Sequence, residues 1–168
     1  MKKQKGFSLI ELLIVVAIIL IIAAIAIPNL LRSRIAANEA SAVGSLRTLN
    51  TAQITYASTY PTVGFADTLA KLGPSANCTT TVSTAAACLV DNILGCGTAP
   101  CVKSGYHFAV HPATAVGTVI PSYELNGDPT APGTSGVRYF CTNSDAVVRA
   151  GTASTTTETA CAALTPLQ

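Results

Sequence analysis

The amino-acid sequence predicts an α+β fold, in which a long N-terminal α-helix packs on a small antiparallel sheet. The chain has 168 residues, enough for about one domain. Residues 12–27 contain no polar side chain, and apolar residues then recur at steps of three, four or seven as far as Tyr56, a pattern typical of a helix with one buried face. After residue 104, short β-prone runs alternate with turn residues, which indicates strands.

Charge is scarce and excludes a nucleic-acid-binding surface. Only 11% of the residues are charged and 49% are apolar, too apolar a composition for a disordered chain. The formal net charge is +2, but Lys2, Lys3 and Lys5 contribute +3, so the remaining residues sum to −1. We therefore expect no nucleic-acid partner held by a basic patch.

The apolar run is long enough to cross a membrane once. Phe7–Leu31 is 25 residues, about 37 Å of helix against a hydrocarbon core of about 30 Å. The lysines that precede it favour a cytoplasmic N-terminus, so the rest of the chain is exported. All six cysteines lie in that exported part, and an even number there predicts disulfides in an oxidising compartment.

The junction before the apolar run carries a family resemblance. A short basic leader ends at Gly6, Phe7 opens the apolar run, Glu11 is the fifth residue after the junction, and Pro28 lies further along. These residues resemble the start of a type IV prepilin, most specifically over residues 1 to about 31. The resemblance implies that a membrane-embedded prepilin peptidase cuts between Gly6 and Phe7 and then methylates the new amine of Phe7.

The resemblance also implies a domain organisation and a destination. We expect a leader peptide (1–6), a transmembrane and assembly helix (7–31), an amphipathic helix that continues into the body (32–58) and a disulfide-containing globular domain (59–168), in a pilin-like arrangement. Inner-membrane pilus assembly machinery would draw the single-pass subunit into a homo-oligomeric helical filament on the cell surface.

Glu11 is a carboxylate inside the apolar run, where an ionised side chain costs several kcal/mol unless it is paired. No basic residue occurs from Gly6 to Leu31, so the nearest cation is the freed amine of Phe7, from the same subunit or a neighbour. We predict the intermolecular pair, with Phe7, Glu11 and Pro28 as assembly residues. The alternative is a glutamate that stays protonated or reaches the membrane interface.

The body is predicted element by element. The long helix ends near Ser58, before Tyr60-Pro61, and a short helix begins with Asp67 as its N-cap and stops at Gly73-Pro74. Residues 75–103 form a connection with at most one helical turn. The predicted strands are 105–111, 118–125, 137–143 and 146–149, with a loop at 126–133, a tight turn at 143–145 and a low-complexity tail at 152–165.

Six cysteines allow 15 connectivities, and the sequence does not choose among them. Our hypothesis is pairing between neighbours: Cys78 with Cys88, Cys96 with Cys101, and Cys141 with Cys161, the last closing a C-terminal loop of the kind that pilins often have. Zinc is a poor alternative, because no C-x-x-C pair occurs.

No catalytic or metal-binding motif is found, so we expect neither an enzyme nor a cofactor. His107 and His111 share one face of a predicted strand, but no carboxylate accompanies them in the sequence, and we expect ordinary surface histidines. The spacing of Asn126, Asp128 and Asp145 matches no calcium loop.

Three functions follow from these observations. The leading hypothesis is a structural subunit of a type IV pilus that serves adhesion, twitching motility or DNA uptake. A pseudopilin of a type II secretion system would share the first 31 residues. A single-pass anchored binding module that never assembles is the alternative of another class, and Glu11 argues against it, since a plain anchor has no use for a carboxylate in lipid.

Overall fold

The computed structural model describes residues 7–75, 78–79 and 82–167. The predicted leader, including Gly6, lies outside the described residues. Internal contacts divide the chain into two compact units, Met1–Arg34 and Ile35–Gln168, and each is described by itself. One helix, α1, contributes residues to both units.

Helix α1 extends over Leu9–Thr59, close to the end predicted at Ser58. It remains helical through Pro28. Its C-terminus coincides with Tyr60-Pro61, because a residue that precedes proline is disfavoured in the α conformation. The amide of Tyr60 still donates to the carbonyl of Tyr56 at 2.8 Å, which satisfies one of the last helical acceptors.

The second half of α1 supplies the core of the body with one apolar stripe. Ala42, Leu46, Leu49 and Tyr56 are all fully buried, which confirms the predicted helical spacing over these positions. Inside the stripe, Asn50 donates to the Thr142 hydroxyl at 2.7 Å and accepts from the Tyr123 hydroxyl at 3.0 Å. These two buried hydrogen bonds fix the helix against the middle of the sheet.

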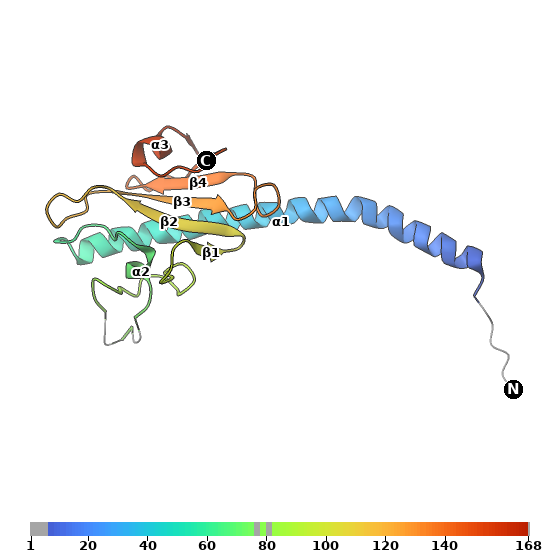
Figure 1. The fold of residues 1–168 in the computed structure, drawn as a ribbon, viewed down its shortest axis with the longest axis horizontal. Helices are drawn as coiled ribbons and strands as arrows, with labels where there is room; N and C mark the ends of the chain where they lie inside the picture. The colour runs from blue at the N-terminus through green and yellow to red at the C-terminus, as the bar shows by residue number, and fades with distance from the viewer. Residues whose placement is uncertain (1–6, 76–77, 80–81, 168) are drawn as a thin grey trace. The chain divides into compact units, whose positions relative to one another are not determined.

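In the part of the chain that the structure describes, the sheet has six antiparallel strands in simple sequence order, so the predicted α+β class is confirmed. Figure 1 shows the strands of residues 35–168 laid beside the second half of α1. The strands are β1 (Cys101–Lys103), β2 (Tyr106–Pro112), β3 (Tyr123–Pro129), β4 (Tyr139–Asn143), β5 (Arg149–Gly151) and β6 (Thr165–Pro166).

The two faces of the sheet differ in chemistry because side chains alternate along each strand. The inner face carries Phe108, Leu125 and Phe140, all buried in the core. A Cβ on Gly127 would lie 3.4 Å from Leu46 Cδ1, so this position of β3 lies close to α1. The outer face carries mainly polar residues of β2, β3 and β4: His107, His111, Glu124, Asn126, Asp128 and Asn143.

The strand predicted over residues 118–125 corresponds to β3, and both of its ends were wrong. β3 begins at Tyr123 rather than Thr118, because residues 116–120 form a tight turn with Gly117 at φ +66°. It continues through Asn126 and Asp128 into the predicted loop. The Asn126 amide donates to the Asp128 carboxylate and to Ser154 of the C-terminal segment, and Ser154 donates to Asp128, so tertiary contacts override their preference for turns.

The last predicted strand was also misplaced. β5 begins at Arg149, whereas the strand was predicted over residues 146–149. Asp145 accepts a hydrogen bond from the Val147 amide at 2.8 Å, and Ala146 has φ +60°. This tight turn occupies the residues that were expected to be extended.

Three short elements were missed and one helix start was wrong. Strand β1 lies within the predicted connection, and α3 (Glu158–Ala162) lies within the predicted tail. Strand β6 begins at Thr165, the last residue of that tail. Helix α2 spans Leu69–Leu72 and its N-cap is Thr68, with no side-chain cap. Asp67 is not the N-cap; instead it forms an ion pair with Lys71 at 2.9 Å.

Candidate functional site

The N-terminal part of α1 presents an unbroken apolar surface. Every large apolar side chain from Phe7 to Leu31 is exposed, with Phe7 itself 72% exposed. The helix is long and apolar enough to cross a membrane, and the most apolar window of 18 residues has a mean hydropathy of 3.3 with none of it buried. A surface of this size requires lipid or other protein segments to cover it.

Glu11 lies in the first turn of α1 and is exposed. No side chain among the described residues forms an ion pair or hydrogen bond with it. The first described basic residue along the chain, Arg32, is 21 positions further on, about 31 Å along a helix. A carboxylate near a helix N-terminus interacts favourably with the helix dipole, but in a membrane it still needs a countercharge.

The predicted assembly residues occupy distinct places. Phe7 precedes the helix, and the amide of Leu12 donates to the Ser8 carbonyl at 3.2 Å as the helix begins. Glu11 therefore lies about one turn along from Phe7, whereas Pro28 lies inside α1. The pairing of Glu11 with the amine of a neighbouring Phe7 stays a prediction.

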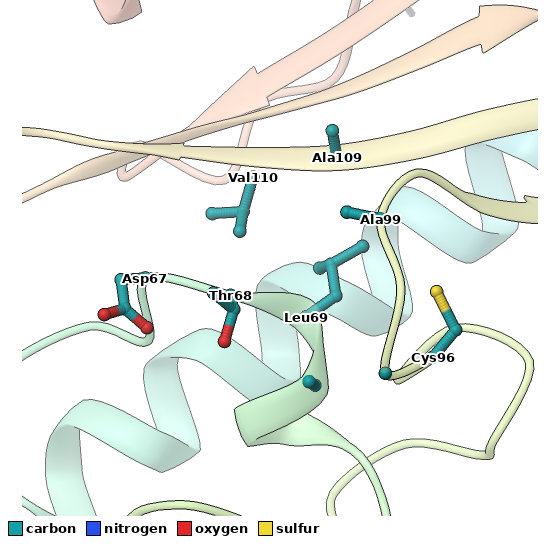
Figure 2. Close-up of a pocket in the computed structure, with 9 residues that line it drawn as sticks. Asp67, Thr68, Leu69, Cys96, Ala99, Ala109 and Val110 are labelled. Atoms are coloured by element: carbon teal, nitrogen blue, oxygen red, sulfur yellow. The ribbon is translucent and has the colours of Figure 1, made fainter.

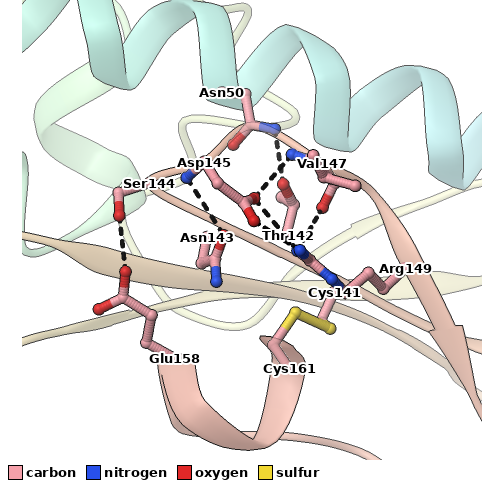
Figure 3. A network of polar contacts seen from close by, with 10 residues as sticks. All are labelled: Asn50, Cys141, Thr142, Asn143, Ser144, Asp145, Val147, Arg149, Glu158 and Cys161. Atoms are coloured by element: carbon pink, nitrogen blue, oxygen red, sulfur yellow. Dashed lines mark hydrogen bonds and ion pairs between the residues drawn. A yellow bond between two sulfur atoms is a disulfide. The ribbon is translucent and has the colours of Figure 1, made fainter. Parts of the chain in front are cut away.

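Three disulfides staple the body: Cys78–Cys88, Cys96–Cys101 and Cys141–Cys161, with Cα–Cα distances of 5.7, 5.6 and 5.9 Å. This is the neighbour pairing hypothesised from the sequence. Figure 3 shows the third bond joining β4 to α3. It holds the C-terminal segment, residues 152–164, beside the outer face of the sheet.

Glu39 is a buried carboxylate of α1 that fastens the helix to the segment before β4. One oxygen accepts the amides of Val137 and Arg138 at 3.0 and 3.1 Å, and the other pairs with the Arg138 guanidinium at 2.8 Å. Burial would raise the pKa of Glu39, but these hydrogen bonds and the positive charge outweigh it and lower the pKa. The role of this pair is structural.

The turn between β4 and β5 is held by a second polar network (Figure 3). The Asp145 amide donates to Asn143 Oδ1 at 3.2 Å, and the Arg149 guanidinium donates to the Asp145 carboxylate. The hydrogen bonds from Arg149 hold the pKa of Asp145 below its usual value. Nearby, Ser144 donates to Glu158 of α3 at 2.6 Å.

The outer face brings the two histidines to carboxylates, which the sequence analysis did not foresee. In the register of β2 with β3, His107 lies opposite Asp128 and His111 lies opposite Glu124. Glu124 is only 1% exposed, and burial raises its pKa to about 7. The expectation that no carboxylate accompanies the histidines was therefore wrong, because strand pairing joins residues distant in sequence.

A cavity of about 170 Å³ between α2 and β2 offers little chemistry. Figure 2 shows Leu69 of α2 and Val110 of β2 extending into the space between these elements, with Asp67 at its edge. Its one carboxylate pairs with Lys71, and its Cys96 is bonded to Cys101. The described lining supplies no nucleophile with an adjacent base, so this cavity does not form a recognisable catalytic site.

The N-terminal segment is similar to known proteins. The family model described as the prokaryotic N-terminal methylation motif matches residues 1–27. The chain carries this motif. The motif includes the three residues on which the resemblance to a prepilin depends: Gly6, Phe7 and Glu11.

Two relatives extend the similarity beyond the methylation motif. A type IV wide pilus major component, PilA4 of Thermus thermophilus, is 64% identical over 39 residues, 23% of this chain and 30% of the relative. A type IV major pilin protein, PilA of Myxococcus xanthus, is 51% identical over 51 residues, 30% of this chain and 23% of the relative. The matches thus span less than a third of either relative. No solved structure matches the chain.

Proposed function

We propose that the protein is a structural subunit of a type IV pilus. Its leader is removed between Gly6 and Phe7, the amine of Phe7 is methylated, and the mature chains assemble through residues 7–31. The observation that carries the proposal is the exposed apolar helix that begins inside the methylation motif, residues 1–27, and carries Glu11. The similarity to two pilus components supports the same function.

The proposal assigns a role to each N-terminal residue. Before assembly, residues 7–31 cross the inner membrane with the leader in the cytoplasm, and lipid covers the apolar side chains. In the filament, the same side chains pack against those of neighbouring subunits. The Glu11 carboxylate then pairs with the Phe7 amine of a neighbour, which sets the axial offset between adjacent helices.

Removal of the leader is what makes this pair available. In the precursor the nitrogen of Phe7 is an uncharged amide, whereas cleavage converts it to an amine that carries a positive charge. Cleavage therefore creates the countercharge that Glu11 requires at the same depth. An uncleaved chain has a membrane anchor but lacks this pair, so processing also controls assembly.

The partners follow from these steps. A prepilin peptidase and methyltransferase acts at the Gly6-Phe7 bond, and inner-membrane assembly machinery extracts the mature subunit. The globular domain, proposed as residues 59–168, remains outside the membrane, where its three disulfides are stable. The filament on the cell surface serves adhesion, twitching motility or DNA uptake.

The test combines intact-mass analysis with imaging of sheared surface filaments. The subunit is expected to begin at Phe7, to lack residues 1–6, to carry a methylated amine and to be the main protein of the filaments. Gly6→Val is expected to block cleavage, because it places a branched side chain at the cut bond. A retained leader contradicts the proposal, and a processed chain absent from surface filaments favours a pseudopilin.

A further inference from the structure

The described ion pairs of residues 35–168 leave three carboxylates without a Lys or Arg partner. Residues 35–168 contain seven acidic side chains, and among the described residues four of them pair with Lys or Arg. The pairs are Glu39–Arg138, Asp67–Lys71, Asp91–Lys103 and Asp145–Arg149. The remaining three, Glu124, Asp128 and Glu158, belong to the outer face of β3 and to the helix α3 that lies beside it.

Glu124 is the most deeply buried of the three, at 1% exposure. Thr155 of the C-terminal segment donates to its Oε1 at 2.6 Å. Its Oε2 is buried and has no hydrogen-bond partner among the described residues. A buried carboxylate oxygen without a donor or a cation is costly, so this atom marks an incomplete site.

His111 supplies a second incomplete atom across the strand pair. It lies opposite Glu124 in the register of β2 and β3, and directly opposed residues have Cβ atoms about 4.5–5.5 Å apart. Its Nε2 is also buried without a partner among the described residues. An imidazole nitrogen and a carboxylate oxygen that both lack a partner are therefore held on adjacent strands.

Both residues line a cavity of about 200 Å³ together with Glu158. The same cavity is bordered by Thr156 and Thr157 of the C-terminal segment. The Glu158 carboxylate accepts hydrogen bonds from Ser122 at 2.7 Å and from Ser144 at 2.6 Å. The cavity thus gathers two carboxylates and one imidazole, with no Lys or Arg among its lining residues.

We propose that this cavity binds a divalent transition-metal ion such as Zn²⁺, with His111 Nε2 and Glu124 Oε2 as ligands and the Glu158 carboxylate as the third. Imidazole nitrogen and carboxylate oxygen are common zinc ligands, and the nitrogen favours zinc over magnesium or calcium, which prefer oxygen. Among the described residues, the ligand atoms of these three side chains do not all lie within 4.8 Å of one another. Binding therefore requires Glu158 to exchange its hydrogen bonds with Ser122 and Ser144 for the ion.

The nearby sulfurs do not compete for the ion. Glu124, Cys141 and Cys161 have ligand atoms within 4.8 Å of one another, but the two sulfurs are bonded to each other and offer no thiolate. The ion would link the C-terminal segment to β3 in addition to the Thr155–Glu124 hydrogen bond and to the disulfide that joins this segment to β4. This role is independent of the proposed assembly through residues 7–31.

The test is a Zn²⁺ titration of the untagged, full-length mature chain in detergent, after treatment with a chelator and confirmation that no thiol is free. Calorimetry is expected to show one bound equivalent, and Co²⁺ in place of Zn²⁺ reports the ligand set by its visible absorption. Zn²⁺ is also expected to raise the melting temperature, because it binds only the folded state.

Three variants decide which residues hold the ion. Glu124→Gln and His111→Asn are each expected to weaken Zn²⁺ binding by about tenfold or more, since even substitutions in the outer shell of a metal site cost about 10–100-fold. His107→Asn is the matched control, on the same strand and face but outside the cavity lining, and it is expected to bind as wild type does.

The proposal is overturned if the wild-type chain takes up no Zn²⁺. It is also overturned if both variants bind like wild type, or if His107→Asn loses as much affinity as they do. Circular dichroism establishes that each variant is folded, and Glu124→Gln keeps the volume and the Oε1 acceptor for Thr155. Failure here leaves processing and filament assembly untouched, so it is distinguishable from failure of the proposed function.

Discussion

From Leu9 to Leu31 every large apolar side chain of α1 is exposed, whereas from Ala42 to Tyr56 the apolar stripe of the same helix is buried. The first region has no core of its own, and its carboxylate, Glu11, has no partner among the described residues. The second region packs on a sheet and belongs to a body stapled by three disulfides. The first region therefore requires other molecules, and the second folds around its own core.

The largest expected effect is in the first region. Glu11→Ala is expected to leave membrane insertion intact and to abolish filaments, because a neighbour's Phe7 ammonium would be left unpaired at a cost of about 3–5 kcal/mol per subunit. Glu11→Asp keeps the charge with a shorter reach, so partial assembly is expected. The measurement compares each variant in membranes and in sheared filaments, and normal filament yield from Glu11→Ala rules out the pair.

The next effect belongs to the body. Replacing Cys141 and Cys161 with serine removes the disulfide that closes a loop of 20 residues, and is expected to lower the free energy of unfolding by about 3 kcal/mol. Denaturant titration of the full chain in detergent measures the change. An unchanged unfolding midpoint would show that this disulfide does not stabilise the folded state.

A pH dependence is expected from Glu124, in buffer that contains a metal chelator. Its pKa is raised from 4.5 to about 7 by burial, so the folded state holds this proton more tightly than the unfolded state does. Its contribution to stability is complete below pH 4.5 and is lost as the pH rises, by about 2 kcal/mol between pH 5 and pH 7. Glu124→Gln is expected to remove this slope, and an unchanged slope would contradict the assignment.

The smallest predicted effect concerns the start of α3. The Thr157 hydroxyl accepts a hydrogen bond from the Ala160 amide at 3.3 Å. Thr157→Ala is expected to cost about 1 kcal/mol, as is typical for loss of an N-cap. Thr156→Ala is the matched control, since its side chain makes no cap, and equal losses in the two variants would contradict the role of Thr157.

The features that were predicted correctly depend on local patterns. The apolar run and the stop at Tyr60-Pro61 are both read from neighbouring residues, and the helix accordingly ends one residue from the predicted position. The stripe through Leu46 and Leu49 follows from helical spacing in the same way. The pairing hypothesised for the cysteines also joins neighbours along the chain.

The features that were missed depend on strand register. Glu124, Asn126 and Asp128 alternate with Tyr123, Leu125 and Gly127, which is the pattern of a strand with one polar face. That alternation predicts β3, but residues 126–129 are Asn, Gly, Asp and Pro, which also favour turns. The segment was therefore predicted to be a loop. The approach of His111 to Glu124 requires the pairing of β2 with β3, which depends on contacts across the sheet rather than on either segment.

The central claim is that chains assemble through a pair between Phe7 and Glu11 of different subunits. It is tested most directly by solid-state NMR of filaments grown from a mixture of subunits, half labelled with ¹⁵N and half with ¹³C. The account predicts transfer between the Phe7 amine nitrogen and the Glu11 carboxylate carbon in the mixed filaments. Transfer that occurs only when both labels are in one chain, or in neither sample, would contradict it.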